Sequence, residues 1–268
     1  MSIIHHLLHI MSLKKNIIYC KIFKFKTKVI PRFTIGDMRF NGYLVRYTDI
    51  FSIYFEYKDI FVNRIYNFVT ENPAPLIIDG GGCIGMSVLY FKSIYPNAKI
   101  ICFEPDEKIF KILQFNISVN NLTDVTLIKA GLASEECSAR FLSDGLDGGK
   151  IIDSEDSTTT INTVRLSDYL DMPVDFLKLN IEGQELPVLQ EAAATGRLQN
   201  VRELVLEYHN WPGKEQCLGK ILELLNFQGF EYLVHDFDAE TNGVTKPPFH
   251  MTSKTTWFCL VYARRMND

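Results

Sequence analysis

The sequence predicts an α/β fold: a doubly wound, mostly parallel sheet with a small N-terminal cap and an antiparallel strand at its C-terminal edge. From residue 75 onward, short apolar runs alternate with longer amphipathic ones, as strands alternate with helices around a parallel sheet. The last two apolar runs, at 230–236 and 255–265, are joined instead by a polar segment that contains proline. We therefore expect these two runs to pair as antiparallel strands at one edge of the sheet.

Residues 1–72 form the expected cap of strands and one helix. The run "KIFKFKTKVI" (21–30) alternates lysine with apolar side chains, which predicts a strand. The run "NGYLVRYTDI" (41–50) begins with a turn signal and predicts another strand. Residues 52–71 are rich in Phe, Tyr and Ile and predict a helix that ends before "NPAP".

Residues 73–268 form the expected main domain, which repeats strand and helix in turn. The pattern predicts strands at 75–80, 98–104, 124–130, 174–180 and 201–209, and helices at 84–96, at 106–121, from about 184, and at 214–228. Residues 133–173 interrupt the series, and we expect irregular structure there, including a polar loop at 143–160. In such a sheet, ligands bind at the carboxyl ends of the strands, near the point where the strand order reverses.

The composition excludes several classes of protein. The chain has 268 residues, 47% of them hydrophobic and 22% charged, as in a globular protein with a substantial core. Its net charge is −4, so no overall positive field attracts nucleic acid. The six cysteines include no C-x-x-C pair, and the start of the chain does not follow the order of a secretory signal. We therefore expect a cytoplasmic protein with reduced thiols, and no apolar run is long enough to span a bilayer.

The charge is unevenly distributed along the chain. Residues 1–36 contain no Asp or Glu but seven basic residues: Lys14, Lys15, Lys21, Lys24, Lys26, Lys28 and Arg32. A basic and partly apolar segment of this kind could touch an anionic membrane surface. The alternative that we favour is a solvated strand or helix that leads into the domain.

The stretch "LIIDGGGCIGMSVLY" (76–90) indicates a cofactor loop. Gly80, Gly82 and Gly85 fit the G-x-G-x-x-G pattern of a dinucleotide-binding turn. Asp79, however, stands directly before the glycines, where an acid would work against a pyrophosphate but would hold an ammonium group. S-adenosylmethionine has an ammonium group and no phosphate. Glu104, at the end of the second predicted strand, would accept hydrogen bonds from the ribose of either cofactor, so both remain open on these residues.

Four segments in order resemble the FkbM-type family of S-adenosylmethionine-dependent methyltransferases. They are "LIIDGGGCIGMSVLYF" (76–91), "CFEPDEKIFKILQFNISVNN" (102–121), "DFLKLNIEGQELPVLQ" (175–190) and "LVLEYHN" (204–210). In that family a D-x-G-x-x-x-G loop precedes an "FEP" strand end, and K-x-D-x-E-G-x-E follows the fourth strand. The resemblance covers roughly residues 45–235.

The resemblance implies a Rossmann-like methyltransferase sheet and the cofactor S-adenosylmethionine. It places the cofactor against these residues: Asp79, Gly80, Gly81, Gly85, Glu104 and Pro105. It also implies O-methylation of a hydroxyl on a small-molecule or glycan acceptor, such as a sugar or a secondary metabolite. The aromatic cap residues and the polar loop 143–160 are the expected walls for this acceptor. The cap residues in question are Tyr43, Tyr47, Phe51, Tyr54, Phe55 and Tyr57.

The sequence departs from the family pattern at two places. Gly82-Cys83 stands where the family usually has Ala-Asn, and the glycine positions of the loop are kept. Asn180 stands where the family motif carries Asp, and an amide can orient a hydroxyl or amino group but cannot remove a proton. Two alternatives therefore stand beside the methyltransferase: an NAD(P)-dependent oxidoreductase, and a catalytically altered methyltransferase-like binding module.

The chemistry requires a nucleophile held in line with an activated methyl group, and a base for its proton. The expected catalytic residues are His209, Glu182 and Asn180, with His209 as the preferred base because its pKa normally lies near the working pH. Glu207 is a further candidate, and His209 as a structural residue is the alternative. We expect no metal. A second mechanism would instead use Glu182, Glu207 and Asn210 to hold Mg²⁺.

Overall fold

The computed structural model describes residues 3–146, 148–152, 159–236 and 247–266, with only the backbone described for 3–13. Its centre is a seven-stranded sheet in the order β12-β13-β11-β10-β3-β4-β5. The strands are β3 (Leu76–Gly80), β4 (Lys99–Phe103), β5 (Val125–Ile128), β10 (Val174–Leu179), β11 (Val201–Asn210), β12 (Phe230–His235) and β13 (Trp257–Arg265). The predicted α/β class with a mostly parallel sheet is confirmed.

The strand order reverses between β3 and β10. The chain passes from β3 to β4 and β5 on one side, and then returns to place β10 against the other side of β3. All pairs from β11 to β5 are parallel, so their carboxyl ends share one edge. That edge, beside the reversal, is where a ligand is expected.

The two closing strands pair antiparallel at one edge of the sheet, as predicted, but the outermost strand is not the expected one. β13 is antiparallel to both of its neighbours, β11 and β12, as expected for the C-terminal strand. It does not take the edge, however, because β12 lies outside it. The side chains of Cys259, Val261 and Ala263 on β13 are buried, as expected for an inner strand, which is covered on both faces. Most side chains of β12 are exposed, so β12 can take the edge.

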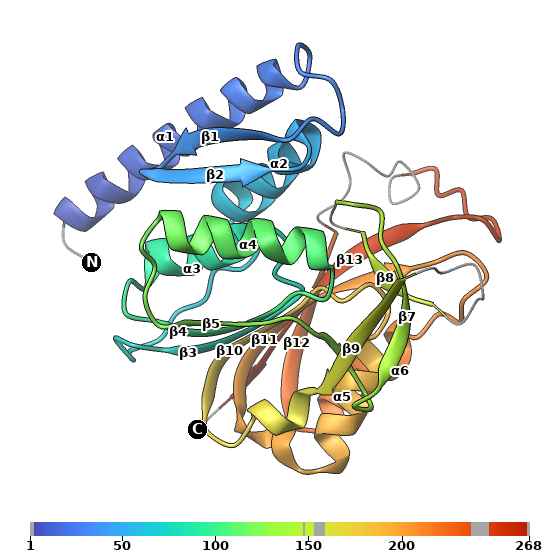
Figure 1. Ribbon diagram of the computed structural model, residues 1–268. Coiled ribbons are helices and arrows are strands. Elements are labelled where there is room, and N and C mark those ends of the chain that lie inside the picture. Colours follow the sequence, from blue (N-terminus) through green and yellow to red (C-terminus); the bar gives the residue numbers. More distant parts are fainter. Residues whose placement is uncertain (1–2, 147, 153–158, 237–246, 267–268) are drawn as a thin grey trace.

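Helices cover both faces of the sheet (Figure 1). On one face lie α3 (Met86–Ile94) and α4 (Glu107–Val119), and on the other α5 (Glu185–Ala194) and α6 (Leu218–Phe227). The buried residues form two clusters that correspond to these faces. Asp106 caps the start of α4, because its carboxylate accepts hydrogen bonds from the backbone N–H groups of Lys108 and Ile109.

The N-terminal cap lies over α3 and α4 (Figure 1). It consists of α1 (Ile3–Lys26), the hairpin β1 (Gly36–Phe40) and β2 (Tyr43–Tyr47), α2 (Ile50–Tyr57) and a π-helical turn η1 (Lys58–Asn63). One cluster of buried side chains includes Phe40 and Tyr57 of the cap together with Leu89 and Phe91 of α3. The cap therefore packs directly on the helix layer formed by α3 and α4, and a domain boundary near residue 72 stays a prediction.

Two predictions for the cap were wrong. The run 21–30, predicted as a strand, is the end of α1 and the turn after it. Phe23 packs edge-on against Phe40 and Tyr57, with ring centroids 5.7 and 4.6 Å apart, and this contact outweighs the alternating pattern. The helix predicted over 52–71 ends earlier, because Arg64 adopts a left-handed conformation (φ 59°) after η1.

The region 133–173, predicted to be irregular, contains most of a second sheet. Its strands are β6 (Gly131–Ala133), β7 (Ser138–Leu142), β8 (Lys150–Ile151) and β9 (Thr159–Arg165), in the order β6-β9-β7-β8, and a 3₁₀ turn η2 (Leu166–Tyr169) follows. Phe141 and Ile161 bury the inner face of this sheet. Residues 147 and 153–158 of the predicted polar loop lie outside the described residues. Among the described helices, none combines the length and apolar character needed to cross a membrane.

Candidate functional site

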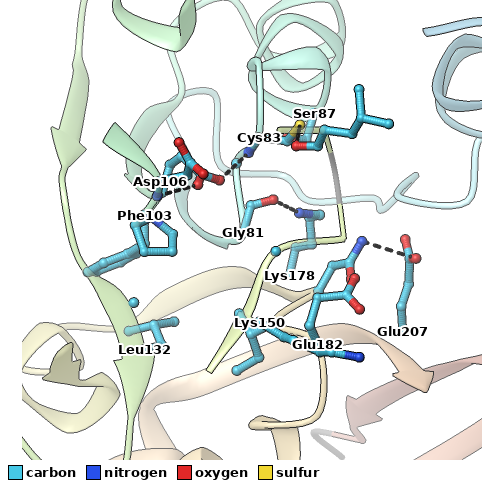
Figure 2. Close-up of a pocket in the computed structure, with 18 of the residues that line it drawn as sticks. Gly81, Cys83, Ser87, Phe103, Asp106, Leu132, Lys150, Lys178, Glu182 and Glu207 are labelled. Carbon is cyan, nitrogen blue, oxygen red and sulfur yellow. Dashed lines mark hydrogen bonds between the residues drawn. The ribbon is translucent and has the colours of Figure 1, made fainter. Parts of the chain in front are cut away.

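A cavity lies at the carboxyl ends of β3, β4 and β10, between the cap and the small sheet (Figure 2). It contains about 1180 Å³ of space between protein atoms, part of it open to solvent. The cavity is therefore at the edge of the sheet where the sequence predicts a ligand.

Asp79 does not line this cavity. Its carboxylate is fully buried, and it accepts hydrogen bonds from Lys178 Nζ at 2.8 Å and from the Ser87 hydroxyl. Lys178 also donates to the carbonyl of Gly81 at 2.8 Å (Figure 2). Burial disfavours the ammonium charge of Lys178, but Asp79 outweighs burial and raises the pKa of Lys178. Lys178 and Ser87 therefore lie between Asp79 and the cavity.

The glycine loop is shaped by close contact with the neighbouring strand end. Gly81 has φ +86°, and a side-chain Cβ there would lie 1.9 Å from the carbonyl oxygen of Asn180. Gly85, at φ +95°, opens α3. Of the predicted cofactor glycines, Gly81 lines the cavity, whereas Gly80 and Gly85 do not. Position 81 therefore needs glycine whatever the loop binds, although Cys83 in the same loop is left-handed (φ 46°) without being glycine.

Glu104 and Pro105 line the cavity as the sequence predicts. Glu104 accepts hydrogen bonds from the backbone N–H of Cys83 at 3.0 Å and from that of Asp106 at 2.8 Å. Burial raises the pKa of Glu104 to about 7, against these bonds that favour its charged form. The two backbone N–H groups thus fix the Glu104 carboxyl group at the end of β4, where its oxygens can accept further hydrogen bonds.

Asn180 and Glu207 both line the cavity and are in contact with each other. The Asn180 amide Nδ2 donates to Glu207 Oε2 at 3.1 Å, and the Tyr66 hydroxyl donates to the other oxygen of Glu207. An aspartate at position 180 could not make the first bond, because it would face Glu207 with a second negative charge. The Asn180 Oδ1 atom is buried and accepts no hydrogen bond from any described residue. This oxygen can therefore accept a hydrogen bond from a bound ligand.

Glu182 lines the cavity, but His209 does not. His209 Nε2 lies 3.4 Å from Glu182 Oε1, and its ring stacks on Trp211 with the planes 4° apart. Burial lowers the pKa of His209 to about 4, so this imidazole is neutral at neutral pH. His209, the base preferred from the sequence, therefore lies behind Glu182 and does not reach the cavity.

The loop that carries Glu182 is held in an uncommon conformation. Glu182 has φ 56° and Gly183 has φ 102°. The Glu185 carboxylate accepts hydrogen bonds from the N–H groups of Ile181 at 3.1 Å and Gly183 at 2.9 Å. A left-handed residue other than glycine is strained and persists only where the surrounding structure holds it, as these hydrogen bonds do here. Glu185, the last acid of the motif, thus supports the loop.

The magnesium alternative loses one of its three ligands. Asn210 lies on the opposite face of β11 from Glu182 and Glu207, and its amide donates to the carbonyl of Thr255 at 3.1 Å. Within the described residues, no three acidic, His or Cys side chains converge as a metal-binding group. The set proposed from the sequence does not form a site.

The charge of the lining favours a cation. Seven carboxylic acids line the cavity: Glu56, Asp59, Glu104, Asp106, Asp144, Glu182 and Glu207. Only two basic side chains do so among the described residues, Lys150 and Lys178, and Lys178 is paired with Asp79. Such a wall repels a pyrophosphate and attracts a ligand with positive charge. This electrostatic balance opposes the NAD(P) alternative.

Sequence reasoning missed Ser87, which reaches the cavity from α3, and gave no role to Lys178, which reaches it from β10. The predicted polar loop 143–160 does supply part of the lining, including Asp144 and Lys150, and the Lys150 ammonium lies 3.9 Å from the centre of the Trp211 ring. Ser87 follows Asp79 by eight residues, on the first turn of the helix, and this spacing could have indicated it. Of the six aromatic cap residues expected as acceptor walls, only Phe55 lines the cavity. Tyr47, Tyr54 and Tyr57 are buried in the core.

Comparison with known proteins gives consistent results. The sequence profile of the methyltransferase FkbM domain matches residues 79–232. The chain is 30% identical over 183 residues to "Methyltransferase 1" of Beauveria bassiana, which covers 54% of this chain and 74% of the relative. It is 38% identical over 81 residues to "Methyltransferase sdnD" of Sordaria araneosa, which covers 30% of this chain and 31% of the relative.

A similar solved structure is that of methyltransferase FkbM from Methylobacillus flagellatus. The alignment has a TM-score of 0.46 and 14% sequence identity, and it covers 80% of this chain. This chain spans only 54% of the length of that protein.

Proposed function

The chain belongs to the FkbM family of methyltransferases, and on this premise we propose that it transfers a methyl group from S-adenosylmethionine to an oxygen atom. The proposed acceptor is a hydroxyl of a small molecule or glycan, such as a sugar or a secondary metabolite. We propose the cytoplasm as its location, since none of the six cysteines forms a disulfide bond.

The acid-rich lining of the cavity is the observation that carries the proposal. S-adenosylmethionine has a sulfonium, an ammonium and one carboxylate, so its net charge is positive and it suits a wall with seven acids and two lysines. Glu104 would accept hydrogen bonds from the ribose hydroxyls, with Pro105 beside it. The orphan Asn180 Oδ1 would accept a hydrogen bond from the ammonium group.

Asp79 acts in this proposal through its neighbours. Its ion pair fixes Lys178, and Lys178 in turn holds the carbonyl of Gly81. The acid before the glycines thus orders the loop that forms one wall of the cofactor site. When bound there, S-adenosylmethionine supplies an activated methyl group on sulfur.

We assign the role of base to Glu182. Its side chain lines the cavity, so its carboxylate would take the proton of the acceptor hydroxyl as the oxygen bonds to the methyl carbon, the sulfur–methyl bond breaks and S-adenosylhomocysteine leaves. His209 contacts Glu182 and not the cavity, and it is neutral because its pKa is about 4. In the proposal His209 is therefore a positioning residue, held by Trp211, that orients the Glu182 carboxylate.

The alternative of an inactive binding module rests on Asn180. In this chain the amide makes a bond to Glu207 that an aspartate would lose. The neighbouring Glu207 thus suits an amide in place of aspartate at position 180, which supports an active enzyme with Asn180.

Methyl transfer can be tested with S-adenosylmethionine that carries carbon-13 in its methyl group, offered with a panel of sugars, glycans and hydroxylated metabolites. We expect a product whose methyl carbon has the NMR chemical shift of an O-methyl ether. An N-methyl or C-methyl shift would overturn the assignment to oxygen. Saturable cofactor binding without transfer to any acceptor would favour the binding module.

A further inference from the structure

The outer face of α1 and the segment after it expose an unusual set of apolar side chains. We define this set as the apolar face: Ile17, Ile18, Ile22, Phe25, Val29, Phe33 and Ile35. Each of these side chains is between 43% and 68% exposed. Ile18, Ile22 and Phe25 follow the i, i+4, i+7 spacing that places residues on one side of a helix. Exposed apolar side chains that gather on one side of a helix mark an interaction site.

The orientation of this face is fixed by the opposite side of the helix. Phe23 is buried against Phe40 and Tyr57, and Asn16 is buried, with its amide donating to the carbonyl of Phe61. Because these contacts anchor the inner side of α1 to the cap, the apolar face must point away from the body of the protein. Figure 1 shows α1 as the outermost layer on the side remote from α5 and α6.

The charge around the apolar face is entirely positive along the chain. Residues 14–36 carry the seven basic residues of the N-terminal segment and no acid. The whole chain has a net charge of −4, so the other residues carry −4 − 7 = −11. Lys14 and Lys21 precede Ile18 and Phe25 by one helical turn, so ammonium groups lie beside the apolar stripe. The acids nearest in sequence, Asp37 and Asp49, are paired with Arg46 and Arg32.

We propose that the apolar face binds the surface of an anionic lipid membrane, with α1 lying in the plane of the interface. The apolar side chains would enter the boundary between headgroups and acyl chains, and the lysines would contact lipid phosphates and carboxylates. Charge opposes a second copy of the chain as occupant, since the same face on two copies would bring two sets of six lysines together, Arg32 being paired with Asp49. The binding is peripheral, as no described helix could span the bilayer.

Cosedimentation of the full chain with lipid vesicles tests this proposal. We expect binding to phosphatidylcholine vesicles that contain phosphatidylserine, weak binding to phosphatidylcholine alone, and release by salt. Lys14→Gln/Lys21→Gln should weaken binding to the anionic vesicles by about fivefold per lysine. Ile18→Ser/Phe25→Ser should weaken it by about tenfold or more, because apolar burial is lost.

Matched controls lie elsewhere on the surface. Phe227 is 86% exposed at the end of α6, so Phe227→Ser removes an exposed ring outside the apolar face. Lys108→Gln removes an exposed lysine on α4. Both controls should bind anionic vesicles as the unmodified chain does, and all variants should share its melting temperature. Vesicle binding that is absent, or that survives Ile18→Ser/Phe25→Ser, would overturn the proposal. So would a dimer in solution that this double substitution dissociates in the absence of vesicle binding.

Discussion

The ionisation of Glu104 should control the affinity for S-adenosylmethionine. Burial raises the pKa of Glu104 to about 7, and only the charged carboxylate can accept hydrogen bonds from two ribose hydroxyls beside a cationic ligand. The competent form therefore predominates above about pH 7 and is lost as the pH falls through that value. One unit below the pKa, about one tenth of the protein is ionised, so the observed Kd should rise about tenfold.

The substitution Glu104→Gln removes the titrating group while it keeps the shape of the side chain. At high pH it should weaken binding by about 1.5–3 kcal/mol, the usual contribution of hydrogen bonds to a charged group. It should also abolish the loss of affinity below pH 7. Isothermal titration calorimetry gives both values. Repeating it in buffers with different ionisation enthalpies should show that the unmodified protein releases a proton on binding near its pKa, and that the variant does not.

Two other carboxyl groups make the experiment decisive. Glu107 lies on α4 outside the cavity and pairs with Lys111 and Lys129, so Glu107→Gln should leave the affinity and its pH dependence unchanged. The pKa of Glu185 is also raised to about 7 by burial, but Glu185 does not line the cavity. If Glu104→Gln retains the full pH dependence, the titration belongs to another group and the placement of the ribose is refuted.

Three further substitutions test the rest of the site. Lys178→Met should lower the free energy of unfolding by about 3–5 kcal/mol in urea titrations, because a fully buried carboxylate loses its partner. Asn180→Asp should destabilise the protein by about 1–3 kcal/mol at neutral pH. This loss should shrink in mild acid, where a proton shared with Glu207 relieves the repulsion. Glu182→Gln should reduce kcat by about 10²–10⁴-fold, whereas His209→Ala should reduce it less, with unchanged Kd for S-adenosylmethionine.

Each of these substitutions has a clear contrary outcome. Lys111→Met removes an exposed ion pair and should lower the free energy of unfolding by at most about 1 kcal/mol. If Lys178→Met lowers it by no more than this, the ion pair of Lys178 with Asp79 contributes little to stability. Asn180→Asp with unchanged stability at both pH values would mean that the amide is not required beside Glu207. A larger loss of kcat in His209→Ala than in Glu182→Gln would return the role of base to the histidine.

The parallel sheet was predictable because its inner strands are buried on both faces and are nearly continuous apolar runs. β3, β4, β5, β10 and β11 all appear where the sequence predicts them. The carboxyl ends of parallel strands meet at one edge, so the approximate location of the site followed from their order. Pro105 and Glu104 line the cavity for this reason.

The remaining errors have two physical sources. The first is that a period of two and a helical period overlap in short runs: residues 21–30 satisfy both, and only the contacts of Phe23 with Phe40 and Tyr57 decide for the helix. The second source is that the sequence does not show how far each side chain lies from the cavity. The sequence places Asp79 and His209 at strand ends but does not indicate which side chains lie in front of them, here Lys178 and Glu182.

A calorimetric titration of the same protein with S-adenosylmethionine and with NADPH distinguishes a methyltransferase from an NAD(P)-dependent oxidoreductase. Both ligands contain an adenosine, but one is a cation and the other carries several phosphate charges. A cavity lined by seven acids and two lysines should bind S-adenosylmethionine saturably and should not bind NADPH. Binding of NADPH without binding of S-adenosylmethionine would contradict the account.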